Sequence, residues 1–151
     1  MVKKTILWAL VIGCMVMIFS FSAQPAGDSM HLSDGLLHKI LQALHISLPE
    51  SVITFMRVFI RKVAHFSIYM LLGFLMYLLV HTGYSVKEKA SAWQAVLYSF
   101  LYAVTDEVHQ LFVPGRSGMV KDVVIDSLGA SFGVAIAFGI CFLLIRRRKN
   151  G

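Results

Sequence analysis

Residues 63–80 read VAHFSIYMLLGFLMYLLV, a run without Asp, Glu, Lys or Arg and close to the roughly 20 residues that a membrane-crossing helix needs. Three further apolar stretches of similar length lie at residues 5–21, 90–112 and 123–145. Because lipid offers no hydrogen-bond partner to a free backbone amide, each stretch is expected to be helical. The sequence therefore predicts an all-α integral membrane bundle of about four transmembrane helices, in one domain over residues 1–151.

The composition of the chain supports a membrane location. Its 151 residues are 58% hydrophobic and 15% charged, with a mean hydropathy of +0.74, and a soluble domain this small could not bury so much apolar surface. Basic residues flank the first and last apolar runs, at Lys3, Lys4 and residues 146–149, as topology anchors and anionic-lipid contacts do. Membrane lipids are therefore the expected partners. Nucleic acid is not, because no nucleic-acid-reading module is recognisable. Nothing in the sequence specifies an oligomeric state.

The apolar run at residues 5–21 has an alternative interpretation, which is a secretory signal peptide. Cleavage after Ala23 would put Phe21 at the −3 position, where a small residue is needed, so a retained helix is expected. An even number of spans places both termini on one side of the membrane. The basic ends and the loop with Lys87 and Lys89 predict that this side is cytoplasmic.

The long loop between the first two spans, residues 22–62, is expected to contain an amphipathic helix in the membrane interface. Asp34 is a suitable N-cap for this helix. Its apolar stripe would consist of Leu36, Leu37, Ile40, Leu41 and Leu44. Pro49 and Glu50 begin another helix, which is expected to run unbroken into the span at residues 63–80.

Polar residues inside or beside membrane spans are energetically costly, and this chain carries four groups of them at span ends. The groups are Ser20, Ser22 and Gln24; Arg57, Arg61 and His65 on one helix face; residues 105–110; and Asp122 with Asp126. Threading the chain through four spans brings all four groups to the extracytoplasmic boundary. This convergence predicts a functional site at that face of the membrane.

The residue types in these groups suit an anionic ligand. Arg116 lies in the tight turn at residues 114–118, which would combine a guanidinium group with backbone amides, as phosphate sites do. Asp122 and Asp126 are four residues apart on one helix face and could share a divalent cation with a phosphate. A histidine beside a carboxylate at this boundary could also transfer protons.

The same groups have structural interpretations. Asp106, Glu107 and Arg116 could form an ion-pair network that fixes the register of the helices. His65 could be a hydrogen-bonded packing residue instead of a catalytic one. The GxxxG pattern at residues 129–133 is better explained by close helix packing than by ligand contact.

The chain resembles the VanZ-like family of membrane proteins through four segments. These are FSAQP at residues 21–25, RKVAHFSIYMLLG at 61–73, TDEVHQLFVPGRSG at 105–118 and KDVVIDSLGASFG at 121–133. The resemblance implies a compact helical bundle with its marked polar residues near the extracytoplasmic face.

The family motif, carried over position by position, implies the site residues of this chain. The motif positions are Ser22, Gln24, Lys62, His65, Tyr69, Asp106, Glu107, His109, Gln110, Arg116 and Asp122. Together with the residue chemistry, they give the candidate catalytic residues His65, Asp106, Glu107, His109 and Asp122. The candidate substrate-binding residues are Ser22, Gln24, Arg61, Lys62, Tyr69, Gln110 and Arg116. Asp122 and Asp126 are the candidate metal ligands, although the family usually has Asn at position 126.

The family takes its name from a member linked to resistance against the glycopeptide teicoplanin, and it is suspected of acting on lipid headgroups or lipid-linked phosphates. The resemblance therefore implies a multi-pass envelope protein that hydrolyses or transfers such a group. Arg61, Lys62 and Arg116 would hold the phosphate, and Glu107 or His65 would act as general base. The alternative is a non-catalytic membrane protein that binds a lipid precursor, a glycopeptide or a partner protein.

Overall fold

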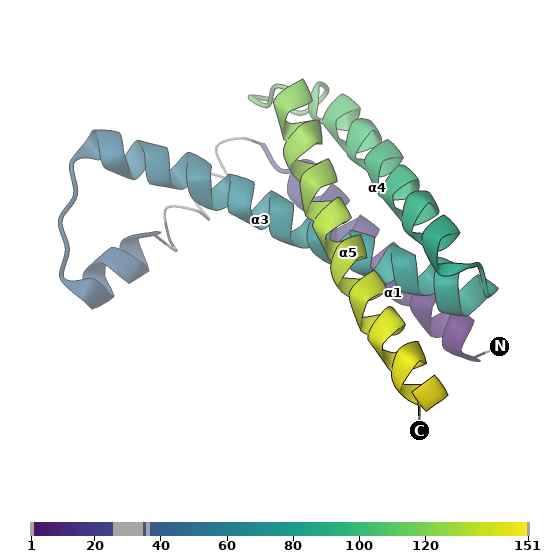
Figure 1. Ribbon diagram of the computed structural model, residues 1–151. Coiled ribbons are helices and arrows are strands. Elements are labelled where there is room, and N and C mark those ends of the chain that lie inside the picture. The colour runs from purple at the N-terminus through teal and green to yellow at the C-terminus, as the bar shows by residue number, and fades with distance from the viewer. Residues whose placement is uncertain (1, 26–34, 36, 151) are drawn as a thin grey trace.

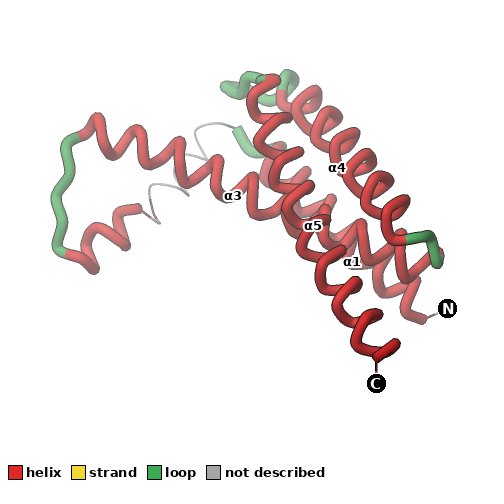
Figure 2. Tube along the Cα trace, viewed as in Figure 1, coloured by secondary structure: helices red, strands yellow, loops and turns green. Residues whose placement is uncertain are grey.

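The computed structural model describes residues 2–25, 35 and 37–150, and every regular element in this part of the chain is a helix. The elements are α1 (Val2–Ser22), α3 (Glu50–Leu78), the π-helical turn η1 (Leu79–Gly83), α4 (Glu88–Gln110) and α5 (Val120–Asn150). Figure 2 shows that short loops join α3, α4 and α5 at the ends of the bundle. The predicted all-α class is confirmed.

Three of the described helices are long and apolar enough to cross a membrane, at Val2–Ser22, Glu50–Gly83 and Val120–Arg147. They contain the spans that the sequence predicts at the corresponding positions. α4 packs in the same bundle (Figure 1), but charged residues near both of its ends make it less apolar. The fourth span therefore stays a prediction.

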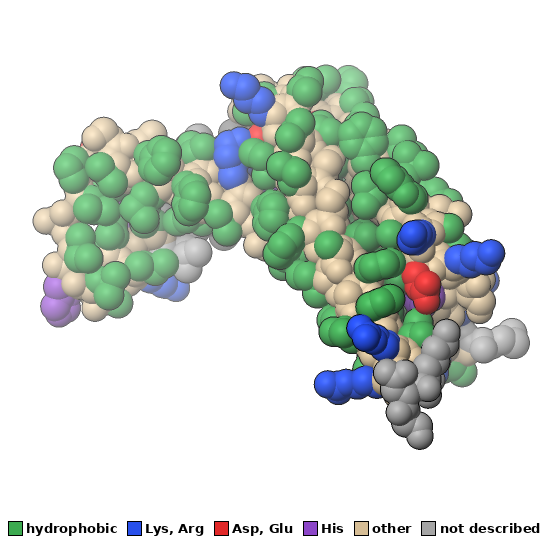
Figure 3. Space-filling model, viewed as in Figure 1, with side chains coloured by type: hydrophobic (Ala, Val, Ile, Leu, Met, Phe, Trp, Pro, Cys, Tyr) green, Lys and Arg blue, Asp and Glu red, His purple; other side chains and the backbone are tan. Residues whose placement is uncertain are grey.

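The helices alternate in direction, so that the start of α1 and the end of α5 lie at one end of the bundle (Figure 1). The loop between α4 and α5 lies at the opposite end. Figure 3 shows apolar side chains over much of the visible bundle surface, with lysines and arginines gathered near its ends. This distribution fits a protein whose sides contact lipid tails and whose ends contact headgroups and water.

α3 and α5 make the most extensive contact in the bundle, because glycines on both helices face the backbone of the other. A Cβ atom on Gly133 would lie 1.8 Å from the carbonyl oxygen of Met70, and one on Gly129 would lie 2.3 Å from that of Phe66. A Cβ atom on Gly73 would lie 2.1 Å from a backbone oxygen of α5. The packing role predicted for the GxxxG pattern is confirmed.

The segment before α3 agrees in part with the prediction. Residues 37–44 are helical. Asp34 and Leu36 lie outside the described residues, and the expected position of this helix in the membrane interface stays a prediction. α3 begins directly after Pro49 and continues unbroken into the predicted span. Its first turns project from the bundle (Figure 1).

Candidate functional site

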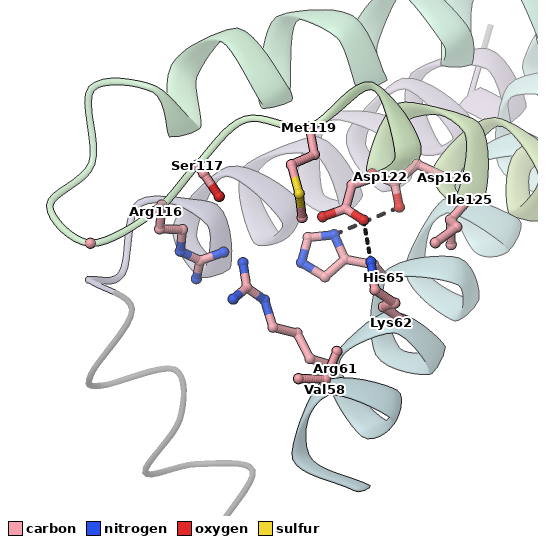
Figure 4. Close-up of a pocket in the computed structure, with 11 residues that line it drawn as sticks. Val58, Arg61, Lys62, His65, Arg116, Ser117, Met119, Asp122, Ile125 and Asp126 are labelled. Carbon is pink, nitrogen blue, oxygen red and sulfur yellow. Dashed lines mark hydrogen bonds and ion pairs between the residues drawn. The ribbon is translucent and has the colours of Figure 1, made fainter. Parts of the chain in front are cut away.

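A polar pocket of about 190 Å³ lies between α3, the α4–α5 loop and the start of α5 (Figure 4). Its polar lining comprises Arg61, Lys62 and His65 from α3, Arg116 and Ser117 from the loop, and Asp122 and Asp126 from α5. The three side chains predicted to hold a phosphate, Arg61, Lys62 and Arg116, therefore border one pocket.

Two acid–base pairs connect α3 to α5 on the wall of this pocket. Lys62 donates a hydrogen bond to Asp122, and Nδ1 of His65 lies 3.7 Å from Oδ1 of Asp126. The bases are three residues apart on α3 and the acids are four residues apart on α5, so each pair of like groups spans about one helical turn. Lys62 compensates the charge of Asp122. The positive charge of Arg61 and Arg116 therefore remains available to an anion in the pocket.

The guanidinium groups of Arg61 and Arg116 point toward one another in Figure 4. Among the described residues, no carboxylate lies within ion-pair distance of either guanidinium group, and the side chain of Arg61 has no hydrogen-bond partner. Burial, followed by the nearby charge of Arg61, lowers the pKa of Arg116. Arginine nevertheless stays protonated in proteins. Two facing cations without a shared acid create the position in this pocket where an anion would be most strongly stabilised.

Arg116 also holds the α4–α5 loop against the end of α1. Its Nε donates to the carbonyl oxygen of Gln24 at 2.8 Å, and its Nη2 donates to that of Phe21 at 2.7 Å. The last carbonyl groups of a helix lack the usual donors from a following turn, so a guanidinium group can cap them. One side chain therefore both lines the pocket and docks α1.

A buried hydrogen-bond network lies behind the pocket and joins α1 to α4. Ser22 Oγ donates to Asp106 Oδ2 at 2.7 Å, and Gln110 Nε2 donates to Glu107 Oε1 at 2.9 Å. Arg116 joins this network through the Oε1 atom of Gln110 at 3.5 Å and makes no ion pair with either acid. The ion-pair network predicted for Asp106, Glu107 and Arg116 is therefore absent among the described residues. Hydrogen bonds through the Gln110 amide connect Glu107 and Arg116 instead.

Glu107 caps the start of α5 and does not line the pocket. Its Oε2 atom accepts a hydrogen bond of 2.9 Å from the backbone N–H of Met119, directly before α5 begins. A side-chain acceptor at this position satisfies a donor that the helix itself cannot satisfy. The structure thus gives Glu107 a structural position, and its predicted role as general base stays a prediction.

We expect Glu107→Gln to lower the free energy of unfolding in detergent by about 1–3 kcal/mol. Glu107 accepts one hydrogen bond from Gln110 and one from the backbone N–H of Met119. A glutamine amide can accept only one of them through its oxygen and would place its own N–H group against the other donor. Glu88→Gln, at the opposite end of α4, is the control and should melt like the wild type. A Glu107→Gln protein that melts normally but loses activity on lipids would instead establish Glu107 as a catalytic base.

Three other predicted site residues lie away from the pocket. The ring of His109 stacks on that of Phe19 with 4.4 Å between centroids, and Tyr69 is fully buried with its ring 6.3 Å from that of Tyr102. Gln24 accepts from Arg116 through its backbone carbonyl. None of these three lines the pocket, and their predicted roles in catalysis or substrate binding stay predictions.

Several residues that build the site were not predicted from the sequence. Ser117 and Met119 line the pocket, and the hydroxyl of Tyr102 donates to a backbone carbonyl of α1 at 2.6 Å. A Cβ atom on Gly118 would lie 2.4 Å from the carbonyl oxygen of Glu107, so the glycine lets the loop pack on α4. The turn composition at residues 114–118 was the available signal for Ser117 and Gly118. No spacing marks Met119 or Tyr102.

The residues best placed to hold a metal differ in part from the predicted pair. Within the described part of the chain, His65, Asp106 and Asp126 are the group whose ligand atoms lie within 4.8 Å of one another. Asp126 was predicted as a ligand together with Asp122, which is instead engaged by Lys62.

A family model described as VanZ/LLP1 matches residues 7–145. No curated protein and no solved structure gives a significant match to the chain. The matched range contains the whole of α3 and α4 and most of α1 and α5, and so it includes every residue of the pocket.

Proposed function

The chain belongs to the VanZ/LLP1 family of membrane proteins, and from this premise we propose that its pocket binds the phosphate of a lipid headgroup or of a lipid-linked precursor. The observation that carries the proposal is the facing pair of Arg61 and Arg116, which share no carboxylate within the described structure. Lys62 borders the same pocket and adds to its positive charge while it compensates Asp122. Phosphate is well matched to two guanidinium groups, because its oxygens can accept several hydrogen bonds at once.

The proposed location of the pocket is the extracytoplasmic headgroup region. The start of α1 and the end of α5, which carry Lys3, Lys4, Arg146 and Arg147, lie together at the end of the bundle away from the pocket (Figure 1). Basic residues of this kind favour the cytoplasmic side. If α4 also crosses the membrane, four spans put both termini in the cytoplasm and the pocket on the opposite side.

Hydrolysis or transfer of the phosphate is the second part of the proposal. His65 faces Asp126 through Nδ1, and Figure 4 shows its other ring nitrogen on the side of the two guanidinium groups. This nitrogen could take the proton of an attacking water or hydroxyl as the new P–O bond forms. The ester P–O bond then breaks, its oxygen takes the proton that His65 accepted, and the guanidinium groups stabilise the phosphoryl charge.

The alternative function is non-catalytic binding of a lipid precursor, a glycopeptide or a partner protein. The hydrogen bonds of Asp106 and Glu107 favour this alternative, because they place two of the predicted catalytic acids in the packing of the helices. Both functions require the anion site, so the first experiment addresses that site directly.

We expect Arg61→Gln to weaken binding of a short-chain phosphatidic acid to the purified protein by about tenfold or more, since a charge-assisted hydrogen bond contributes roughly 1.5–3 kcal/mol. Calorimetry in detergent measures this, with inorganic phosphate titrated in parallel to separate a lipid site from a free-phosphate site. Arg57→Gln is the matched control. It removes the same charge one turn earlier on α3, where Arg57 pairs with Glu50 at 3.1 Å. Equal affinities for all three proteins would contradict the proposal.

Mass spectrometry of cellular lipids then separates catalysis from binding. A headgroup or polyprenyl-phosphate species that changes with the wild type, but not with Arg61→Gln or His65→Gln at equal membrane levels, would establish chemistry. Matching lipid profiles with retained phosphatidic acid binding would favour the non-catalytic alternative. The proposed link to teicoplanin-type resistance is tested in the same strains by the inhibitory concentration of the drug.

A further inference from the structure

We propose that His65, Asp106 and Asp126 form a binding site for a divalent metal ion behind the phosphate pocket. The three residues come from α3, α4 and α5, and their ligand atoms lie within 4.8 Å of one another. His65 and Asp126 also line the pocket, so an ion at this position would adjoin any phosphate bound there. The inference goes beyond the anion site and does not depend on it.

The two carboxylates of this group have unsatisfied oxygen atoms in a buried position. Asp126 is fully buried, and neither of its oxygens has a hydrogen-bond partner among the described residues. Asp106 is 3% exposed, and while its Oδ2 accepts from Ser22, its Oδ1 has no partner there. A buried carboxylate oxygen without a hydrogen bond is strongly unfavourable. Three such oxygens, two of Asp126 and one of Asp106, lie beside the imidazole of His65.

The charge balance of the group also calls for a cation. Two buried carboxylates lie close together in this group, and no described base lies within hydrogen-bond distance of either one. The nearby Lys62 is engaged by Asp122, and His65 approaches Asp126 only to 3.7 Å, which is longer than a hydrogen bond. A divalent ion would neutralise both acids and satisfy their free oxygens at once.

The donor set suits a transition metal such as Zn²⁺ or Mn²⁺. One imidazole nitrogen with carboxylate oxygens is a typical set for these ions, and catalytic zinc sites use three protein ligands with an open position. Neighbouring donors of a tetrahedral Zn²⁺ site lie roughly 3.4 Å apart, so side-chain rotations would have to draw the ligand atoms of this group, which lie within 4.8 Å of one another, closer together. The hydrogen bond from Ser22 to Asp106 would orient that ligand, as outer contacts of metal ligands do.

A metal here would add specific chemistry to the neighbouring pocket. When bound, it would polarise a phosphate oxygen and lower the pKa of a coordinated water. His65 would then act as a ligand and not as a general base.

The experiment is metal binding to the purified protein in detergent, without lipid or phosphate. After loading with Zn²⁺ or Mn²⁺ and desalting, the wild type is expected to retain about one ion per chain, measured by inductively coupled plasma mass spectrometry. Asp126→Asn and Asp106→Asn should each lower the affinity by about a hundredfold or more, since even contacts outside the ligand set contribute 10–100-fold. Asp122→Asn should retain the ion, and this result would distinguish the proposed site from a site made by Asp122 and Asp126. Glu50→Gln, on the exposed start of α3, is the control and should also retain the ion.

A melting experiment on the same proteins keeps the proposal testable if a variant folds poorly. Zn²⁺ or Mn²⁺ should raise the melting temperature of the wild type and not that of Asp126→Asn. Absence of both retained ion and thermal shift in the wild type would overturn the proposal. Ion retention unchanged in both Asp126→Asn and Asp106→Asn would overturn it as well. Because no lipid is present, these outcomes are independent of the Arg61→Gln test.

Discussion

Gly133→Ala is expected to destabilise the helical bundle by about 1–3 kcal/mol, as overpacking of a well-packed contact does. Gly139→Ala, less than two turns further along the same helix, is expected to be neutral or to stabilise by up to about 1 kcal/mol, because Ala is the better helix former. The opposite signs follow from the contacts. A Cβ atom at Gly133 would lie 1.8 Å from the carbonyl oxygen of Met70, whereas one at Gly139 meets nothing within 4 Å. Since the atom that a Cβ at Gly133 would meet belongs to the backbone of α3, α3 and α5 must move apart to make room for it.

Thermal melting of both variants in the same detergent, followed by circular dichroism, measures the difference. The separation of α3 and α5 should also weaken phosphatidic acid binding, because the pocket takes Lys62 from one helix and Asp122 from the other. Equal melting temperatures for Gly133→Ala and Gly139→Ala would show that the two helices do not approach as described.

The fold was predictable from the sequence because a bilayer leaves few choices. Long apolar runs such as residues 63–80 must be helices in lipid, and alternating passes bring polar ends that are distant in sequence to one boundary. The hydrogen bond from Ser22 to Asp106 and the pairing of Lys62 with Asp122 show that these polar residues lie together at one end of the bundle, while the position of that end at the extracytoplasmic boundary stays a prediction. α4 is the exception. Its charged ends leave an apolar stretch that is too short for composition alone to decide whether this helix crosses the membrane.

The partners within the site were not predictable, because they depend on how each helix is rotated about its axis. Spacing alone could place Asp122 and Asp126 on one face of α5, but α3 supplies each of them with a different base. Glu107 and Asp106 are adjacent in sequence and therefore point in different directions. Glu107 reaches the start of α5, whereas Asp106 faces α1 and the group that contains His65.

Arg116→Lys is expected to lose both phosphatidic acid binding and the docking of α1, although the positive charge is kept. The guanidinium group donates to the carbonyl oxygens of Phe21 and Gln24 through two different nitrogens, while it faces Arg61 in the pocket. A single ammonium group cannot reach two carbonyls and an anion at the same time. We expect a loss of about 2–4 kcal/mol in stability from the missing hydrogen bonds, together with at least the tenfold loss of affinity expected for Arg61→Gln.

Hydrogen–deuterium exchange at residues 19–25 and calorimetry with phosphatidic acid separate the two roles of Arg116. Lys121→Gln is the control, since it removes a base from the exposed first turn of α5 without touching the pocket lining. Faster exchange together with lost binding would support a guanidinium that serves both roles. Normal exchange with lost binding would make Arg116 a ligand for the anion alone. Wild-type behaviour in both measurements would contradict the prediction, because it would show that an ammonium replaces every contact that the guanidinium makes.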